Sequence, residues 1–121
     1  MDLTQDTLLS KNFIRNYEDN NIYVGEEVYD FDILISNNKI QKWEFGKIEH
    51  LAPKNLDCVF DLEPEIIIFG TGKKIIIPAE KIINEIHHRK IGIEYMITNS
   101  ACKTFNILLN EGRNVSAILY V

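Results

Sequence analysis

The second half of the sequence alternates short apolar runs with amphipathic helical periods, and this order restricts the fold more than any other feature. Two runs of β-branched residues are continuous rather than alternating, which predicts strands covered on both faces. Apolar positions spaced by three and four predict two helices. The predicted elements are strands 65–69, 74–77, 93–97 and 115–121 and helices 79–90 and 100–110. Strands that alternate with helices in this way imply right-handed crossovers and a mainly parallel sheet.

The first half predicts antiparallel strands. Hydrophobic alternation over residues 28–36 is typical of a half-buried strand. Asn37 and Asn38 supply a two-residue hairpin turn, and 39–45 is the partner strand. We therefore expect one α/β domain over residues 1–121, after a loosely ordered leader at 1–11. Its three layers would be the two helices, a mixed central sheet and this N-terminal antiparallel hairpin.

Composition excludes several classes of protein. The net charge of −5 argues against nucleic acid or an anionic membrane as the main partner. No apolar run approaches the roughly 20 residues that span a bilayer, and the first residues do not resemble a signal peptide. Cys58 and Cys102 are too few for a disulfide framework, so a reducing cytoplasm is the expected location.

The candidate ligand site consists of two loops that we expect at one edge of the sheet. Parallel strands 65–69 and 93–97 would deliver their carboxyl ends there, where open α/β sheets bind ligands. The first turn of the second helix would offer free amides to a small anion, and a lysine would supply the opposite charge. The residues of this cleft are Gly70, Thr71, Gly72, Thr98, Ser100 and Lys103. The competing interpretation of Gly70-Thr71-Gly72 is a tight turn without a ligand.

Other polar residues are expected to be structural. Glu94 lies in a strand that we expect to be covered, so it needs a basic partner, Arg113 or Lys103, and a structural ion pair with Arg113 is predicted. Lys103, Asn106 and Asn110 form the polar stripe of the second helix.

Neither catalysis nor metal binding is indicated by these residues. Cys102 is expected to pack. His87 and His88 are adjacent and point to different sides of a helix, and His50 stands alone in a loop. We expect no catalytic residue, no metal site and no cofactor.

The last 55 residues or so resemble the Mth-type α/β domain family, which includes the mitochondrial NADH:ubiquinone oxidoreductase complex I assembly factor 3 and the adipogenesis-associated Mth domain protein. The residues that carry the resemblance are Gly70-Thr71-Gly72, Gly92, Glu94, Met96, Thr98, Ala101, Thr104, Asn106, Leu108, Glu111, Arg113 and Val115. Two positions depart from the family's usual pattern. Lys103 stands where arginine is frequent, and Ile97 where aspartate is frequent.

The resemblance implies the three-layer Mth-type fold and an assembly role through protein contacts. Our hypothesis is a non-catalytic binding or assembly module with an unidentified protein partner, or one that forms a homo-oligomer. The alternative is a small-anion-binding protein or weak enzyme that uses the cleft between the Gly70-Thr71-Gly72 loop and the 100–110 helix.

Overall fold

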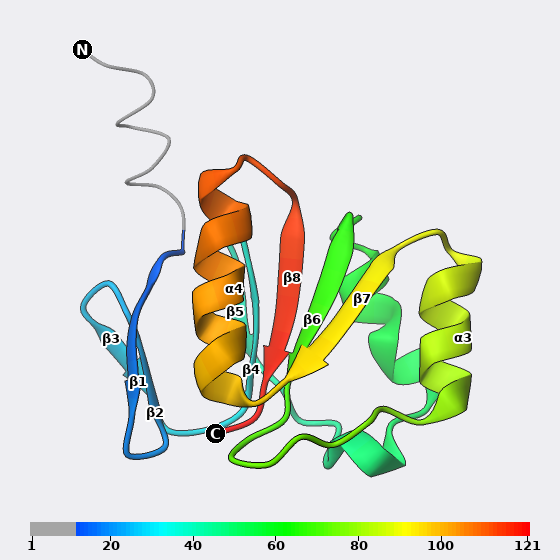
Figure 1. Cartoon of the computed structure of the whole chain (residues 1–121), viewed down its shortest axis with the longest axis horizontal. Helices are drawn as coiled ribbons and strands as arrows, with labels where there is room; N and C mark the ends of the chain where they lie inside the picture. The colour runs from blue at the N-terminus through cyan, green and yellow to red at the C-terminus, as the bar shows by residue number, and fades with distance from the viewer. Residues whose placement is uncertain (1–11) are drawn as a thin grey trace.

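The computed structural model describes residues 12–121, which form two β-sheets and several helices (Figure 1). The smaller sheet is antiparallel, with the order β1-β2-β3. Its strands are β1 (Ile14–Glu18), β2 (Asn21–Val24) and β3 (Glu27–Tyr29). The larger sheet has the order β5-β4-β8-β6-β7. Its strands are β4 (Ile33–Ser36), β5 (Ile40–Lys42), β6 (Ile66–Gly70), β7 (Gly92–Met96) and β8 (Val115–Leu119). The leader predicted at 1–11 lies outside the described residues.

The larger sheet is mixed, as expected. β6 runs parallel to both β7 and β8, while β4 is antiparallel to β8 and to β5. The prediction that 65–69 and 93–97 are parallel neighbours is therefore confirmed.

Each face of the larger sheet is covered by different elements, so the fold has three layers with a mixed sheet at the centre, as predicted, but the two helices that we expected in one layer lie on opposite faces. α4 (Thr98–Asn110) lies on one face, with the β1–β3 sheet beside it (Figure 1). On the other face lie α3 (Glu80–His88), the short helices η1 (Ile48–His50) and η2 (Pro53–Leu56), and α2 (Asp57–Phe60). The alternation along β6 explains the arrangement, because Ile68 contributes to the first cluster whereas Ile67 and Phe69 contribute to the second.

The predicted strand 28–36 is in fact two strands in different sheets. The chain leaves β3 at residue 29 and enters β4 at residue 33. Between them, the backbone carbonyl of Asp32 accepts from the Trp43 N–H and its carboxylate accepts from the Val121 N–H. The hairpin at Asn37 exists, but it belongs to the central sheet. The described residues form no hairpin layer opposite the helices: the β1–β3 sheet packs beside α4, on the same face of the larger sheet.

Residues 74–77 are also not a strand. The Thr71 hydroxyl donates to the Lys74 carbonyl and accepts from the Ile76 N–H, and Gly72 has a φ of +93°. These features turn the chain away from the sheet after β6. The segment instead runs as a loop along the sheet edge toward α3 (Figure 1).

Candidate functional site

The loop after β6 and the start of α4 meet at the end of the sheet where the parallel strands finish (Figure 1). The Thr71 N–H donates to the Met96 carbonyl at 2.8 Å, and the Thr98 N–H donates to the Gly72 carbonyl at 2.9 Å. The Gly72 N–H donates to Thr98 Oγ1, also at 2.8 Å. The two loops are therefore joined to each other, and the amides of Thr71 and Gly72 are already paired within the protein.

Thr98 connects a third segment to this junction. Its side chain is fully buried, and its hydroxyl donates to the Tyr120 carbonyl while it accepts from Gly72. The Tyr120 N–H in turn donates to the Gly70 carbonyl at 2.9 Å. One threonine hydroxyl thus holds together the exit of β6, the start of α4 and the C-terminal end of β8.

Each residue of the Gly70-Thr71-Gly72 loop has a structural role. A Cβ atom at Gly70 would lie 2.9 Å from Leu119 Cδ2 and 3.0 Å from Ala101 Cβ, so only glycine fits between β8 and α4. The hydroxyl of Thr71, as described above, closes the turn. Gly72 occupies the left-handed region of φ, which glycine adopts without strain.

Lys103 lies away from this loop. Thr71 and Gly72 line a hollow of about 280 Å³ together with Lys47 and Tyr120. Lys103 instead lines a hollow of about 200 Å³ between α4 and β1, opposite Arg15. Ser100 is half-buried on α4. The proposed anion cleft therefore lacks the Thr71 and Gly72 amides as free donors, and its lysine faces another hollow.

The hollow around Lys103 belongs to the junction between β1 and α4. The Tyr17 hydroxyl is buried there and has no hydrogen-bond partner among the described residues, and burial raises the pKa of this phenol. Burial likewise raises the pKa of the Cys102 thiol to about 12. A thiol in this state is a poor nucleophile, which agrees with the packing role expected for Cys102.

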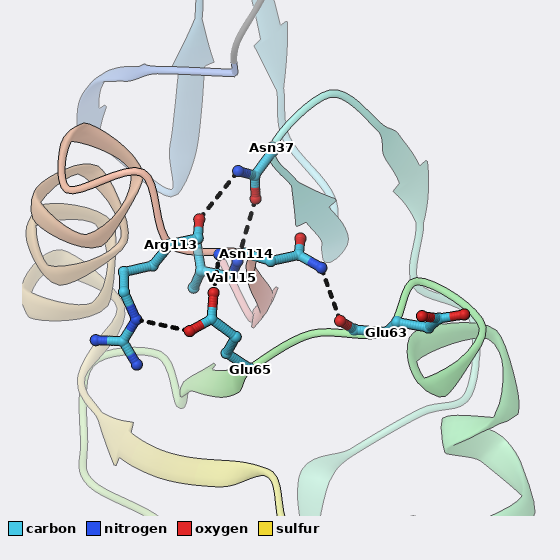
Figure 2. A network of polar contacts seen from close by, with 6 residues as sticks. All are labelled: Asn37, Glu63, Glu65, Arg113, Asn114 and Val115. Atoms are coloured by element: carbon cyan, nitrogen blue, oxygen red, sulfur yellow. Dashed lines mark hydrogen bonds and ion pairs between the residues drawn. The ribbon is translucent and has the colours of Figure 1, made fainter.

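A second polar network lies at the opposite end of the sheet, where the parallel strands begin (Figure 2). Arg113 Nε pairs with Glu65 Oε1 at 3.0 Å, and the Asn114 N–H donates to Glu65 Oε2 at 2.8 Å. The predicted Glu94–Arg113 pair was therefore wrong in its acidic member. Glu94 is exposed on β7, whereas its register partner Ile68 on β6 is buried in the cluster that includes α4.

Asn37 completes this network. Its Nδ2 donates to the Arg113 carbonyl at 3.0 Å, and its Oδ1 accepts from the Val115 N–H at 3.1 Å (Figure 2). Sequence reasoning identified Asn37 only as a turn residue and did not identify Glu65 at all. Nothing in the local sequence pattern of either residue indicates a partner that lies about 50 to 80 positions away.

Two further observations concern residues 12–121. Within this range, no group of three or more His, Cys, Asp or Glu side chains could hold a metal ion. None of the helices in the same range is both long and apolar enough to cross a membrane.

The fold is that of a small Mth938-like α/β domain. A Mth938-like domain from Bordetella pertussis superposes with a TM-score of 0.76 at 21% identity, covering 90% of this chain and 85% of that one. A solved structure from Xanthomonas campestris has a TM-score of 0.82 at 27% identity, covering 89% and 83%. A family described as "Protein of unknown function (DUF498/DUF598)" matches residues 14–120, and the chain belongs to this family.

The relatives with names include one bacterial protein and one assembly factor found in several animals. The "13 kDa major membrane protein" of Francisella tularensis subsp. holarctica is 30% identical over 98% of both chains. The mouse "NADH dehydrogenase [ubiquinone] 1 alpha subcomplex assembly factor 3" is 31% identical over 78% of this chain. The match covers 52% of the mouse protein, so this chain corresponds to about half of that relative.

Proposed function

We propose that this chain is a non-catalytic binding or assembly module that acts through protein–protein contacts at the free edge of β7. The observation that carries the proposal is the exposure of this strand. β7 is the outer strand of the larger sheet, and none of its five residues is buried. Outer strands with unpaired backbone groups bind extended segments of other chains by adding them to the sheet.

Ile93 and Tyr95 of β7 direct their backbone N–H and C=O groups outward, whereas their neighbours in the strand bond to β6. The Gly92 N–H donates to Glu65 and the Met96 carbonyl accepts from Thr71, so both residues face β6. Because alternate residues of a parallel strand bond to the same neighbour, the N–H and C=O groups of Ile93 and Tyr95 point to the free edge. These two donors and two acceptors are the backbone groups that an added strand would use.

The other edge of the sheet is protected, which makes the exposure of β7 specific. β5 has only three residues, and it carries Lys42 with the ammonium 5.1 Å from the centre of the Phe31 ring. Short outer strands that carry lysine are poor templates for pairing. β7 is longer and has one charge, Glu94, and the exposed Tyr95 ring adds apolar area beside its backbone.

The chemistry of β7 favours a different protein over a second copy. An antiparallel pair of β7 strands that uses all of the outward groups would place Ile93 opposite Tyr95 of the second copy. Glu94 would then lie directly opposite Glu94, and like charges in that position destabilise a strand pair. The occupant that we propose is an extended segment of another protein.

The relationship to assembly factor 3 supports an assembly role by analogy, since half of that protein corresponds to this chain. A cytoplasmic location is part of the proposal. It is supported by the free thiols of Cys58 and Cys102, which suit a reducing compartment.

The experiment compares capture of partner proteins by the wild type and by Tyr95→Pro. Proline removes the outward N–H of residue 95, and an outer strand tolerates this change because the N–H is not used by β6. Tyr95→Phe retains the N–H and the ring, and Tyr95→Ala retains the N–H alone. Each variant is used as bait in native extract, and captured proteins are identified by mass spectrometry.

We expect the wild type and Tyr95→Phe to capture the same protein. Tyr95→Ala should capture less of it, and Tyr95→Pro should capture none. A partner that Tyr95→Pro binds as well as the wild type does would overturn the assignment to this edge. A wild type that captures only its own copies would overturn the choice of occupant.

A further inference from the structure

A loop at another part of the surface combines the two most exposed large apolar side chains of the described residues with adjacent lysines. The loop comprises residues 73–77, between β6 and α3, and we call it the 73–77 loop. Ile75 and Ile77 are each 64% exposed. Lys73 and Lys74 precede them and are exposed as well. Figure 1 shows the loop beyond the end of the larger sheet at which the parallel strands finish, on the way from β6 to α3.

The backbone of the loop fixes the direction of the isoleucines. Ile76, the central residue, is partly buried and packs against the core cluster beneath the sheet. Its N–H donates to Thr71 Oγ1 at 3.2 Å, which anchors the middle of the loop. Since successive side chains of an extended segment point to opposite sides, Ile75 and Ile77 both point away from the protein. The structure thus holds two aliphatic side chains in water.

The charges near the loop are mainly positive, although the chain as a whole is acidic. Besides the two lysines of the loop, the exposed Lys47 lines the hollow next to Gly72 and Ile76, and Lys81 follows in the first turns of α3. The acidic residues nearby are Glu49, in the same hollow, Asp32, whose carboxylate accepts from the Val121 N–H beside it, and Glu80. Five other acidic residues lie in the separate β1–β3 sheet and its connections, at Glu18, Asp19, Glu26, Glu27 and Asp30.

This combination fits a lipid surface better than a protein or a nucleic acid. Lysine is depleted in protein–protein interfaces, and the aromatic or arginine residues that anchor such interfaces do not occur in the 73–77 loop. A nucleic acid backbone would bind the lysines but would give the isoleucines nothing apolar to contact. In a bilayer, by contrast, aliphatic side chains enter the boundary between headgroups and acyl chains while lysines bind anionic headgroups.

We propose that the 73–77 loop is a peripheral membrane contact, in which Ile75 and Ile77 insert into an anionic phospholipid bilayer and Lys73 and Lys74 bind its headgroups. The contact is reversible and sensitive to salt, because it has only a few charges and a small apolar area. It uses a surface other than the β7 edge and does not depend on the function proposed above.

The test is flotation of the purified protein with phospholipid vesicles. One set of vesicles contains phosphatidylcholine alone, and the other contains equal amounts of phosphatidylcholine and phosphatidylglycerol. The wild type is expected to float with the anionic vesicles at low salt, to be released at high salt, and to stay unbound with phosphatidylcholine alone. Ile75→Ser/Ile77→Ser should lower the binding constant at least about tenfold. Lys73→Gln and Lys74→Gln should each lower it about fivefold.

Ile107→Ser is the matched control, because Ile107 is 58% exposed and lies on α4, outside the loop. It should float like the wild type, and so should Tyr95→Pro. Thermal melting checks that each variant is folded, and the single variants Ile75→Ser and Ile77→Ser replace the double variant if it melts lower. Absence of wild-type flotation at low salt would overturn the proposal. Flotation that depends on the lysines but not on the isoleucines would also overturn it, because that result describes charge attraction without insertion.

Discussion

The side-chain amide of Asn106 forms two hydrogen bonds with the backbone of Ile14. Its Oδ1 accepts from the Ile14 N–H at 2.9 Å, and its Nδ2 donates to the Ile14 carbonyl at 2.7 Å. The amide thus replaces the neighbouring strand that β1 lacks on that side, since β1 is the outer strand of its sheet. This contact joins the β1–β3 sheet to α4 across 92 positions of sequence.

Replacing Asn106 with alanine should therefore destabilise the fold. The change leaves the N–H and C=O groups of Ile14 without their partner in a partly buried position, which costs about 1–3 kcal/mol. Asn110→Ala is the control, because Asn110 is exposed on the same helix and its loss should change stability by less than about 0.5 kcal/mol. Denaturant unfolding measures both values, and equal stabilities of the two variants would contradict the structural role of the amide.

Gly70→Ala should destabilise the protein by about 1–3 kcal/mol, because the added methyl group has no space between β8 and α4. One of the atoms that it would meet is the backbone Cα of Thr98, at 3.1 Å, which cannot move independently of the helix. Gly92→Ala is the matched control in a neighbouring strand, since its nearest contact would be 3.4 Å, to Ile66. Thermal melting of both variants is the measurement. A Gly70→Ala protein as stable as Gly92→Ala would show that the junction can expand.

The stability contributed by Glu65 should depend on pH. The pKa of this carboxyl is lowered, first by the hydrogen bond from the Asn114 N–H and then by Arg113. Because the pKa is lowered in the folded state, the stabilisation by the Glu65 carboxylate is complete above its ordinary pKa near 4.5. This stabilisation is lost as the pH falls through the pKa of the folded state. The difference in unfolding free energy between the wild type and Glu65→Gln should therefore be largest near neutral pH and should shrink in acid.

Glu63→Gln provides the control for this titration, because Glu63 joins the network through its backbone carbonyl and not through its carboxylate (Figure 2). Its stability relative to the wild type should vary less between neutral and acidic pH. A wild-type advantage over Glu65→Gln that grows as the pH falls would have the wrong sign for a lowered pKa.

The parallel part of the fold was predictable because its information is local. Continuous apolar runs identified β6, hydrophobic periodicity identified α3 and α4, and their order along the chain required parallel neighbours. The meeting of Gly72 and Thr98 at one edge followed from the same order. What the sequence did not indicate was that these two residues would pair with each other and use the amides that a ligand would need.

The errors arose where a residue's environment is determined by a contact that the hydrophobic pattern does not show, most often with a distant part of the chain. The run Ile75, Ile76 and Ile77 has strong β propensity, but the Thr71 hydroxyl captures the Ile76 N–H and prevents pairing in the sheet. Arg113 binds Glu65, 48 positions away, rather than the Glu94 of a strand that we expected to be covered. Asn106 was placed on an exposed polar stripe, because the alternation of β1 does not show that it packs on α4.

The reactivity of Cys102 can report whether the junction between β1 and α4 opens. The thiolate is the form that alkylating reagents attack, and burial, with a pKa raised to about 12, keeps this group protonated near pH 8. The Cys58 thiol also has a raised pKa but is only half-buried, so it serves as the internal reference. Iodoacetamide should label Cys58 of the folded protein much faster than Cys102, and denaturant should make the two rates similar.

Because Asn106 holds β1 against the helix turn that carries Cys102, Asn106→Ala should increase the rate of labelling at Cys102 more than at Cys58. Peptide mass spectrometry after timed labelling gives both rates, and a Cys102 that reacts as fast as Cys58 in the folded wild type would contradict a closed junction.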